Sequence, residues 1–379
     1  MNRILYVATR FHTNQVQALK SLMDNGAEVR FVSHYTQKTE NYAYLEPMVL
    51  GYSPIFIKLT KLLKIDLKRQ SKLCRLIGFP PITKLARIMD EFQPDLLVSR
   101  DCIFYSLISM YLARLRGIKV VLYVQVPEDG IQRNLPIMLT KTLLSKYVMT
   151  PIKGKKERSG LKNVFFVPLV IDKNRYLTDE VGRDREIRSR EGKVNIIMVA
   201  EFSPRKQILE FLEVIKRLTM SRHGIRVKLI GNATKHYTRD YLDRVVGYID
   251  ENGLRRYVDV DVNLSHEEVL KEYVKNDIFV LSSKRESAGF ALLEAMSSGL
   301  AVVCTSSTGL KEYIVHGESG FVFHSNRFDE LYTYLKKLLE DPEMVKAFGE
   351  KNIDLIEDRY RSRRYYEAIS HMWDQMNRG

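Results

Sequence analysis

Two glutamates, Glu286 and Glu294, bracket a short segment whose residue types are typical of a ligand site. The segment follows the apolar run 278–281, contains Gly289 and overlaps the helix-like run 292–296. A buried strand, a loop and a helix in this order place unpaired backbone N–H groups and the positive end of a helix dipole at the carboxyl edge of a sheet. We therefore expect an anionic ligand there. Within the helix, Glu294 is suited to accept hydrogen bonds from a ribose rather than to hold phosphate.

Length and composition indicate what kind of chain positions these glutamates. With 379 residues, of which 45% are hydrophobic and 28% charged, the chain suits two soluble domains of roughly 150 to 200 residues each. Its first apolar run lacks the features of a signal peptide, and no run approaches the roughly 18 apolar residues of a membrane-spanning helix. The three cysteines are too scattered for a disulfide framework or a metal site, so we expect a cytosolic protein.

The net charge of +14 is distributed unevenly along the chain. Residues 1–180 contain 28 Lys and Arg residues against 15 Asp and Glu residues, whereas the remaining residues contain 32 against 31. This asymmetry predicts an anionic partner for the first half, either a membrane surface, an acidic glycan or a nucleic acid. Nucleic acid is disfavoured, because the cations follow an apolar stripe rather than stacking aromatics and the sequence contains no recognised nucleic-acid-binding module.

Short apolar runs alternate with helical patterns in both halves, which predicts parallel sheets with crossover helices. The predicted fold class is therefore α/β, with two doubly wound, Rossmann-like domains in series. We place the first domain at 1–172, a polar linker at 173–192, the second domain at 193–345 and charged helices at 346–379. The predicted strands are 4–8, 28–33, 96–99, 119–124, 147–150 and 164–167 in the first half, and 194–200, 227–231, 258–262, 277–281, 301–305 and 320–323 in the second.

Several blocks of the second half follow the order and spacing of a known family. They are 195–206, 229–231, 276–283, 286–294, 295–303 and 309–312. Over about residues 193–325 the chain resembles the GT-B retaining glycosyltransferases of family four, the glycosyl transferases group 1. The resemblance implies a GT-B fold, in which two Rossmann-like domains face each other across a cleft. It also implies an acceptor-binding first domain and carboxyl-terminal helices that cross back onto that domain.

The resemblance further implies roles for individual residues in binding a nucleotide-sugar donor. Glu286 would contact the donor sugar or stabilise positive charge on its ring, and Lys206 would offset charge on the diphosphate; these two are the predicted catalytic residues. Glu294 would bind the ribose. The alternatives are a solvated loop carboxylate for Glu286 and a simple complement to the helix dipole for Glu294. The other predicted donor-binding residues are Gly231, Ala288, Gly289, Phe290, Ala291 and Leu292, most of them through backbone amides.

One position departs from the family's pattern. The family usually has an arginine five residues before the diphosphate-binding lysine, and this chain has Glu201 there. The neighbouring Arg205 is the candidate substitute, and an ordinary surface arginine is an equally good interpretation. The sequence leaves the second phosphate contact open.

Asp259 and Asp261 form a DxD pattern, which binds a metal-nucleotide complex in a different glycosyltransferase fold. Here the pattern falls in the strand-like run 257–262, so we expect its aspartates to face solvent. We predict no metal ion and no cofactor, with Lys206 and helix amides neutralising the diphosphate.

The acceptor is expected to contact loops at the carboxyl ends of first-domain strands. The candidates are Arg10 and His12 after the first strand, and Arg100 and Asp101 after the run 96–99. A further candidate, Gln125, stands where many relatives carry a sugar-contacting histidine. A histidine on a surface loop is the alternative for His12.

A basic stretch at about 55–76 predicts an interfacial helix. Its leucines form an apolar stripe beside cations that recur every three or four residues, the pattern of a helix lying on an anionic membrane. A helix packed by its leucines, with a solvated basic face, is the alternative. The predicted membrane-facing cations are Lys58, Lys61, Lys64, Lys68, Arg69, Lys72 and Arg75.

Together these features predict a retaining hexosyltransferase that moves a sugar from a nucleotide-sugar, UDP-linked rather than GDP-linked, to a glycan acceptor. The acceptor is expected to be lipid-linked or a cell-surface polysaccharide precursor. We expect the protein in the cytoplasm, peripherally at the inner face of the cell membrane. The alternatives are a non-catalytic, nucleotide-sugar-binding partner of a glycosylation complex and a GT-B epimerase or phosphorylase.

Overall fold

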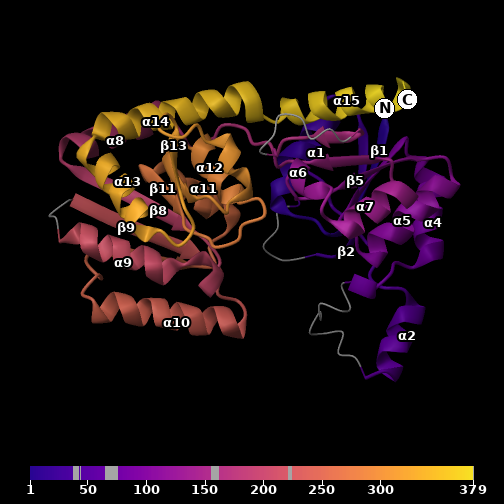
Figure 1. The fold of residues 1–379 in the computed structure, drawn as a ribbon, viewed down its shortest axis with the longest axis horizontal. Coiled ribbons are helices and arrows are strands. Elements are labelled where there is room, and N and C mark those ends of the chain that lie inside the picture. Colours follow the sequence, from indigo (N-terminus) through magenta and orange to yellow (C-terminus); the bar gives the residue numbers. More distant parts are fainter. Residues whose placement is uncertain (37–41, 43, 65–75, 155–161, 221–223, 379) are drawn as a thin grey trace. The chain divides into compact units, whose positions relative to one another are not determined.

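The computed structural model describes residues 1–36, 42, 44–64, 76–154, 162–220 and 224–378. The chain divides into two compact units (Figure 1). Unit 1 comprises Met1–Val170 and Ser362–Gly379, and unit 2 comprises Ile171–Arg361. The chain therefore ends in the unit in which it begins.

The expected boundaries differ from these units in two places. The segment 173–192, expected to be a linker, contains helix α8 (Asp179–Arg190) and belongs to unit 2. Arg185 provides the physical reason, because its guanidinium donates hydrogen bonds to the carbonyl groups of Val274, Ser298 and Gly299 and so ties α8 to the unit. Helix α14 (Pro342–Leu355) also stays in unit 2, so the chain returns to unit 1 at Ser362 rather than at residue 346.

Unit 1 is built on a parallel sheet that has seven strands within the described residues, in the order β3-β2-β1-β4-β5-β6-β7. Successive residues of a strand point to opposite faces of the sheet. Ile4 and Tyr6 of β1 join the core beneath α1 and α15, whereas Leu5 and Val7 join the core beneath α4, α5 and α7. The strands are β1 (Arg3–Arg10), β2 (Glu28–Tyr35), β3 (Met48–Val49), β4 (Leu96–Arg100), β5 (Lys119–Tyr123), β6 (Tyr147–Thr150) and β7 (Val164–Phe166). The helices are α1 (Val16–Asp24), α2 (Pro54–Leu62), α4 (Ile82–Phe92), α5 (Phe104–Leu115), α6 (Glu128–Ile131), α7 (Leu135–Leu143) and α15 (Arg363–Arg378).

Unit 2 contains a second parallel sheet, which has six strands within the described residues, in the order β10-β9-β8-β11-β12-β13. This is the doubly wound order, and it reverses direction between β8 and β11. The strands are β8 (Lys193–Val199), β9 (Gly224–Gly231), β10 (Val258–Val262), β11 (Ile278–Leu281), β12 (Ala301–Thr305) and β13 (Gly320–Phe323). The remaining helices are α9 (Ile208–Thr219), α10 (His236–Glu251), α11 (His266–Val274), α12 (Phe290–Ser297) and α13 (Phe328–Glu340). Every predicted strand is confirmed, and β3 is an additional short one.

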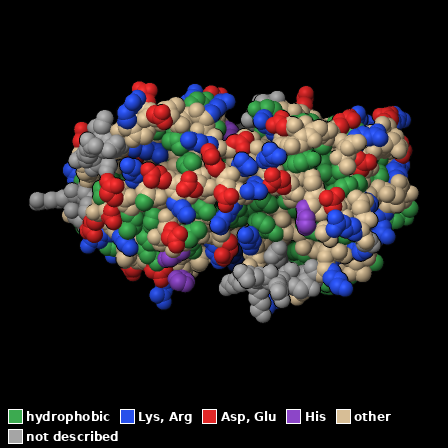
Figure 2. Space-filling view, turned by 90° about the horizontal axis from the view of Figure 1, so that it is seen from above, with side chains coloured by type: hydrophobic (Ala, Val, Ile, Leu, Met, Phe, Trp, Pro, Cys, Tyr) green, Lys and Arg blue, Asp and Glu red, His purple; other side chains and the backbone are tan. Residues whose placement is uncertain are grey.

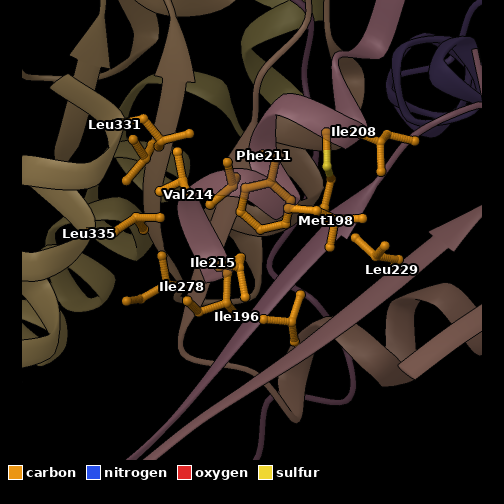
Figure 3. Packing of buried hydrophobic residues seen from close by; sticks show 14 of the residues in the cluster. Ile196, Met198, Ile208, Phe211, Val214, Ile215, Leu229, Ile278, Leu331 and Leu335 are labelled. Atoms are coloured by element: carbon orange, nitrogen blue, oxygen red, sulfur yellow. The ribbon is translucent and has the colours of Figure 1, made fainter. Parts of the chain in front are cut away.

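The core of unit 2 fixes α9 against the sheet. Figure 3 shows Phe211 and Ile215 of α9 beside Ile196 and Met198 of β8, and all four side chains are at most 1% exposed. The helix begins only two residues after Lys206, which lies in the short turn η2 (Pro204–Lys206). The packed helix therefore anchors the loop that carries the predicted diphosphate-binding lysine.

The basic helix expected at about 55–76 lies only partly within the described residues. Helix α2 ends at Leu62, and Lys64 has a left-handed backbone with φ of 54°. Lys68, Arg69, Lys72 and Arg75 lie outside the described residues. Among the helices in the described part of the chain, none is both long and apolar enough to cross a bilayer.

Gly231, at the end of β9, has no space for a side chain. A Cβ atom there would lie 2.1 Å from the carbonyl oxygen of Ala200 and 2.8 Å from the ring of Phe202. We expect Gly231→Ala to reduce the free energy of unfolding of unit 2 by about 1–3 kcal/mol, the usual cost of overpacking. Urea unfolding monitored by circular dichroism measures the change.

The matched control for this prediction is Gly247→Ala in α10, where an added Cβ meets no atom within 4 Å. Alanine there should stabilise the helix by up to about 1 kcal/mol. If both variants unfold at the same urea concentration as the parent protein, the close approach of β9 to residues 200–202 does not limit the side chain at this position.

Candidate functional site

The predicted donor residues of unit 2 lie in loops at the carboxyl ends of β8 and β11, the two strands that flank the reversal of strand order. Lys206 follows β8 and Glu286 follows β11. Two hydrogen bonds join these loops: the Ser282 hydroxyl donates to the carbonyl oxygen of Lys206 at 2.8 Å, and the Lys284 amide donates to that of Arg205 at 2.9 Å. The crevice at such a reversal is the usual ligand site of doubly wound sheets.

A third loop, which follows β12, holds Glu286 from its other side. The Gly309 amide donates to the Glu286 carbonyl oxygen at 2.8 Å, and the Glu286 amide donates to the Ser307 carbonyl oxygen at 3.3 Å. The backbone of Glu286 is thus fixed to the loop that follows β12, while its side chain contacts the loop that follows β8. The carboxylate position therefore follows from the sheet and not from a flexible loop.

Lys206 and Glu286 form an ion pair whose side chains are 10% and 14% exposed. The Arg205 guanidinium lies 3.2 Å from the same Glu286 oxygen and is 44% exposed. Two cations beside one carboxylate leave an excess of positive charge, and partial burial strengthens the attraction of that charge for an anion. In addition, the hydroxyls of Ser203 and Ser283, in the same two loops, are buried without a hydrogen-bond partner. The site therefore combines a net positive charge with unused polar groups.

The predicted backbone contacts at the start of α12 are partly corrected. Gly289 precedes the helix with φ of 76°, and a Cβ there would lie 3.1 Å from both Glu286 and Thr308, so glycine is required by conformation and space. The Leu292 amide, expected to contact the donor, instead donates to the Gly289 carbonyl oxygen at 2.9 Å. The first turn of a helix leaves its amides without intrahelical acceptors. Those of Phe290 and Ala291 are therefore the ones suited to an anion.

Glu294 lies in α12 and is only 7% exposed. Its carboxylate accepts a hydrogen bond from the Tyr273 hydroxyl at 3.1 Å and lies 2.7 Å from Nε2 of His266. Burial, together with the nearby Glu294 carboxylate, raises the pKa of Tyr273 well above its usual value, so the tyrosine remains a donor. A carboxylate has about four acceptor positions. Glu294 therefore keeps acceptor capacity for a hydroxyl group of a ligand.

His266 and Tyr273 are absent from the predicted site. Both lie on α11, whose start is fixed by a reciprocal capping interaction between Ser265 and Glu268. The Ser-x-x-Glu spacing was a readable signal for the start of this helix. The contact with Glu294 depends on the packing of α11 beside α12, which no local pattern specifies.

Glu201, which replaces the family's arginine, is neutralised by a neighbouring lysine. Its carboxylate lies 3.6 Å from the Lys235 ammonium and accepts a hydrogen bond from the Tyr237 hydroxyl at 3.3 Å. The hydrogen bond with the Tyr237 hydroxyl is the main cause that raises the pKa of Lys235, and the Glu201 carboxylate raises it further. The substitution at residue 201 therefore does not leave an uncompensated negative charge, and Arg205 is the arginine that the structure places beside Lys206 and Glu286.

The DxD aspartates differ in their surroundings. Asp259 is exposed, as expected, whereas Asp261 is half-buried and pairs with Lys228 at 3.1 Å. Among the described residues, no group of His, Cys, Asp and Glu side chains has the arrangement of a metal site. Lys228, on the neighbouring strand β9, is the ion-pair partner of Asp261.

The acceptor candidates of unit 1 gather at the carboxyl ends of three adjacent strands, β1, β4 and β5. Arg10 donates through Nε to Nε2 of His12 at 2.8 Å, and Gln125 donates to the Tyr123 hydroxyl at 3.2 Å. Arg100, at the end of β4, lies 3.7 Å from Asp101, and its guanidinium lies 5.6 Å from the centre of the Tyr123 ring. Tyr123 was not among the predicted site residues.

Electrostatics within this group, the acceptor-edge cluster of Arg10, His12, Arg100, Asp101, Tyr123 and Gln125, favour a neutral histidine and disfavour ionisation of the Asp101 carboxyl. Burial first, and then Arg100 and Arg10, lower the pKa of His12 to about 3. Burial raises the pKa of Asp101, and Arg100 opposes that shift. Asp101 also has a left-handed backbone with φ of 65° and donates its amide to the Tyr123 carbonyl oxygen. One Nη atom of Arg100 is buried without a partner. The cluster can therefore donate hydrogen bonds to an uncharged or anionic group.

Comparison with known families finds a match in unit 2. Residues 183–354 match the family described as glycosyl transferases group 1. These residues include Lys206, Glu286 and Glu294. The match thus covers most of unit 2 and agrees with the family resemblance seen in the sequence.

Individual relatives match parts of the chain. The sulfoquinovosyl transferase SQD2 of Arabidopsis thaliana is 36% identical over 89 residues, which cover 23% of this chain and 18% of that protein. The capsular polysaccharide biosynthesis glycosyltransferase CapM of Staphylococcus aureus is 22% identical over 172 residues, which cover 45% of this chain and 43% of that protein. The chain spans less than half the length of these curated relatives.

A solved structure resembles the whole chain. The structure of Anabaena HepE in complex with UDP matches with a TM-score of 0.72 at 12% identity, over 99% of this chain and 100% of that one. At this identity the likeness concerns the fold alone. The expected GT-B fold is confirmed.

Two buried histidines of unit 1 should remain neutral in mildly acidic solution. Burial lowers the pKa of His34 to about 4, as it lowers that of His12 to about 3. An unfolded chain binds these protons near pH 6.5. The two groups therefore contribute stability above about pH 6.5 that is lost as the pH falls towards 4 and 3.

We expect two histidine resonances, assigned with His12→Gln and His34→Gln, to stay at neutral-form chemical shifts in an NMR titration from pH 7.5 down to about 5. The urea-unfolding midpoint should fall less steeply with decreasing pH in each variant than in the parent protein. Titration of His12 near pH 6.5 would mean that water reaches the acceptor-edge cluster freely.

Proposed function

We propose that this chain is a retaining glycosyltransferase that moves a sugar from a nucleotide-sugar donor to a glycan acceptor. The observation that carries the proposal is the Lys206–Glu286 pair, with Arg205 beside it, at the strand reversal of a unit that matches the glycosyl transferases group 1. A diphosphate fits this site because it is anionic and would meet Lys206, Arg205 and the first amides of α12. Glu294 is the proposed acceptor for ribose hydroxyls.

The proposed reaction is a displacement on one face of the donor sugar. The bond between the anomeric carbon and the diphosphate oxygen breaks, and the acceptor hydroxyl oxygen bonds to the same carbon from the same face. The acceptor proton passes to the leaving phosphate oxygen, so no side chain has to act as the base. Lys206 stabilises the charge that develops on the diphosphate, and Glu286 stabilises positive charge on the sugar ring.

The proposed donor is a UDP-linked hexose, used without a metal ion or cofactor. The structure of HepE, which shares the fold, contains UDP, and this favours uridine over guanosine as the base. Metal independence is proposed because Lys206, Arg205 and the α12 amides supply the positive charge that a cation would otherwise supply.

The acceptor is proposed to be lipid-linked or a cell-surface polysaccharide precursor, and the protein to bind the inner face of the cell membrane from the cytoplasm. Helix α2 supports this proposal. Ile55, Leu59 and Leu62 form one stripe along the helix and are 72%, 48% and 79% exposed, so these leucines are not packed into unit 1. Lys58 and Lys61 lie beside the stripe, and the buried side of α2 is formed by Phe56 and Thr60. This is the arrangement of a helix at an anionic interface.

A non-catalytic nucleotide-sugar-binding partner is a second candidate. Glu201 favours it, because the usual arginine is absent and Lys235 turns towards this carboxylate. An epimerase or phosphorylase of the same fold would turn over the donor without a glycan acceptor, or with inorganic phosphate in place of the acceptor. Product analysis with and without an acceptor separates these functions.

We expect Lys206→Ala to lower the rate of sugar transfer by about a hundred- to a thousandfold, the effect of removing a group that stabilises charge in a transition state. Glu286→Gln should lower it by a similar factor, because the variant keeps the shape but loses the charge. Transfer from UDP-hexoses to a membrane extract that contains native acceptors measures the rate. The matched control is Lys351→Ala, which removes an exposed cation of α14 from the same unit.

The same assay in EDTA should give an unchanged rate for the parent protein. Loss of transfer in EDTA would contradict the metal-free mechanism. Full activity of both Lys206→Ala and Glu286→Gln would contradict the donor site. Donor binding is followed separately as a rise in melting temperature with UDP, which increases with the ratio of ligand concentration to Kd.

Charge reversal on α2 and at Lys64, two residues after its end, should weaken membrane binding. We expect the variant Lys58→Glu, Lys61→Glu and Lys64→Glu to lose about tenfold or more in affinity for vesicles that contain phosphatidylglycerol, since each cation near such a surface contributes about 1 kcal/mol. Vesicle co-sedimentation measures the affinity, and the UDP-induced rise in melting temperature confirms that unit 2 is intact. Unchanged sedimentation would show that the basic face of α2 is simply solvated.

A further inference from the structure

Two helices of unit 1 expose large apolar side chains that neither the donor site nor α2 explains. They are neighbours on the face of the sheet opposite α1 and α15 (Figure 1). Between 49% and 67% of each of these side chains is exposed. The residues are Phe104, Tyr111 and Leu115 on α5, and Leu135, Leu139 and Leu143 on α7.

The spacing places each set on one side of its helix. The residues of α5 recur after seven and four positions and those of α7 after four and four, so each set forms a single stripe. The helices are joined at their carboxyl ends, where the Arg114 guanidinium donates to the Leu143 carbonyl oxygen at 2.9 Å. Both stripes therefore belong to one outward surface, which we call the α5–α7 surface.

The chain segments that form the α5–α7 surface are basic. The segments 102–127 and 130–156, which include both helices, contain no aspartate or glutamate. Arg114, Arg133 and Lys146 are exposed at the ends of the helices. By contrast, positive and negative side chains are interspersed on the face of unit 2 that carries α14 (Figure 2). The neighbouring carboxylate of Asp90 on α4 is paired with Arg116, and Glu128 and Asp129 stand between the two segments in the sequence. An apolar surface whose own helices carry cations and no carboxylates is complementary to an anionic lipid surface.

The α5–α7 surface begins at the acceptor-edge cluster. Helix α5 starts at Phe104, three residues after Asp101, and α7 follows Gln125 by way of the short helix α6. In a parallel sheet each helix that follows a strand starts at the carboxyl edge. The stripe on α5 therefore runs away from the residues expected to contact the acceptor.

We propose that the α5–α7 surface is a second lipid-contact surface, which lies on an anionic bilayer and receives the lipid part of the acceptor while its sugar reaches Arg100 and Asp101. The inference rests on the proposed function, in which the acceptor is lipid-linked. A second copy of this chain is the less suitable occupant, because an isologous contact would bring the same cations together from both copies. An anionic bilayer covers the apolar side chains and neutralises those cations at the same time.

The test uses the full chain and vesicles of phosphatidylcholine, with or without phosphatidylglycerol. The variant is Leu115→Gln, Leu135→Gln and Leu139→Gln, because glutamine suits exposed helix positions and removes apolar area without adding charge. The matched control is Met220→Gln in unit 2, where the side chain is 72% exposed. Co-sedimentation measures vesicle binding, sedimentation velocity measures the oligomeric state, and the UDP-induced rise in melting temperature reports on the donor site.

We expect the triple variant to bind phosphatidylglycerol vesicles at least about tenfold more weakly than the parent protein, since each leucine loses the burial of its side chain. Met220→Gln should bind like the parent. Equal binding of the triple variant and the parent overturns the proposal. A parent dimer that the triple variant dissociates, with unchanged vesicle binding, also overturns it and assigns the surface to a second copy. The UDP response is independent of these outcomes, so its absence counts against the proposed donor and not against the lipid surface.

Discussion

The donor site depends on one constraint, the parallel alignment of β8 and β11 at the point where the strand order of unit 2 reverses. Parallel strands bring the carboxyl ends of both strands to one edge, and the reversal sends the following helices to opposite faces, which opens a crevice between the loops. Lys206 lies in the loop after β8 and Glu286 in the loop after β11, and their side chains form an ion pair. Because α9 is packed into the core two residues after Lys206, and Glu286 is hydrogen-bonded to the loop after β12, neither loop can shift without breaking these contacts. The sheet therefore sets the distance between the two charges.

The ion pair also explains how the site holds excess positive charge before a ligand binds. A lysine that is 10% exposed would be costly without an anionic partner, and Glu286 provides one. A bound diphosphate would offer Lys206 a second anion, and Arg205 would then remain beside Glu286 to compensate its charge. The replacement of an arginine by Glu201 is compatible with this arrangement, because Lys235 neutralises residue 201 locally. Lys235 thus balances Glu201, Arg205 balances Glu286, and Lys206 is left for the ligand.

Much of the fold and part of the site follow from the sequence, for reasons that particular residues make clear. Buried parallel strands are continuous apolar runs, so all the longer strands were predictable, whereas β3 has two residues and no such signal. Lys206 and Glu286 lie in the loops that follow β8 and β11, and the family resemblance assigned both to the donor site. The contact of Glu294 with His266 and Tyr273 was not, because it depends on how α11 packs beside α12. The free amide expected at Leu292 was wrong because the first turn of α12 closes on Gly289.

The carboxyl-terminal helix gives unit 1 two unlike faces. Helix α15 packs beside α1, and the Tyr365 hydroxyl lies 2.8 Å from that of Tyr6, so the chain itself covers this side of the sheet. On the other side, α5 and α7 bury one stripe against the sheet and leave a second apolar stripe uncovered. Uncovered apolar area of this kind costs free energy in water and is typical of interaction surfaces. Since the same helices start at the edge that carries Arg100 and Asp101, a ligand with an apolar tail and a polar head would find both of its contacts on one unit.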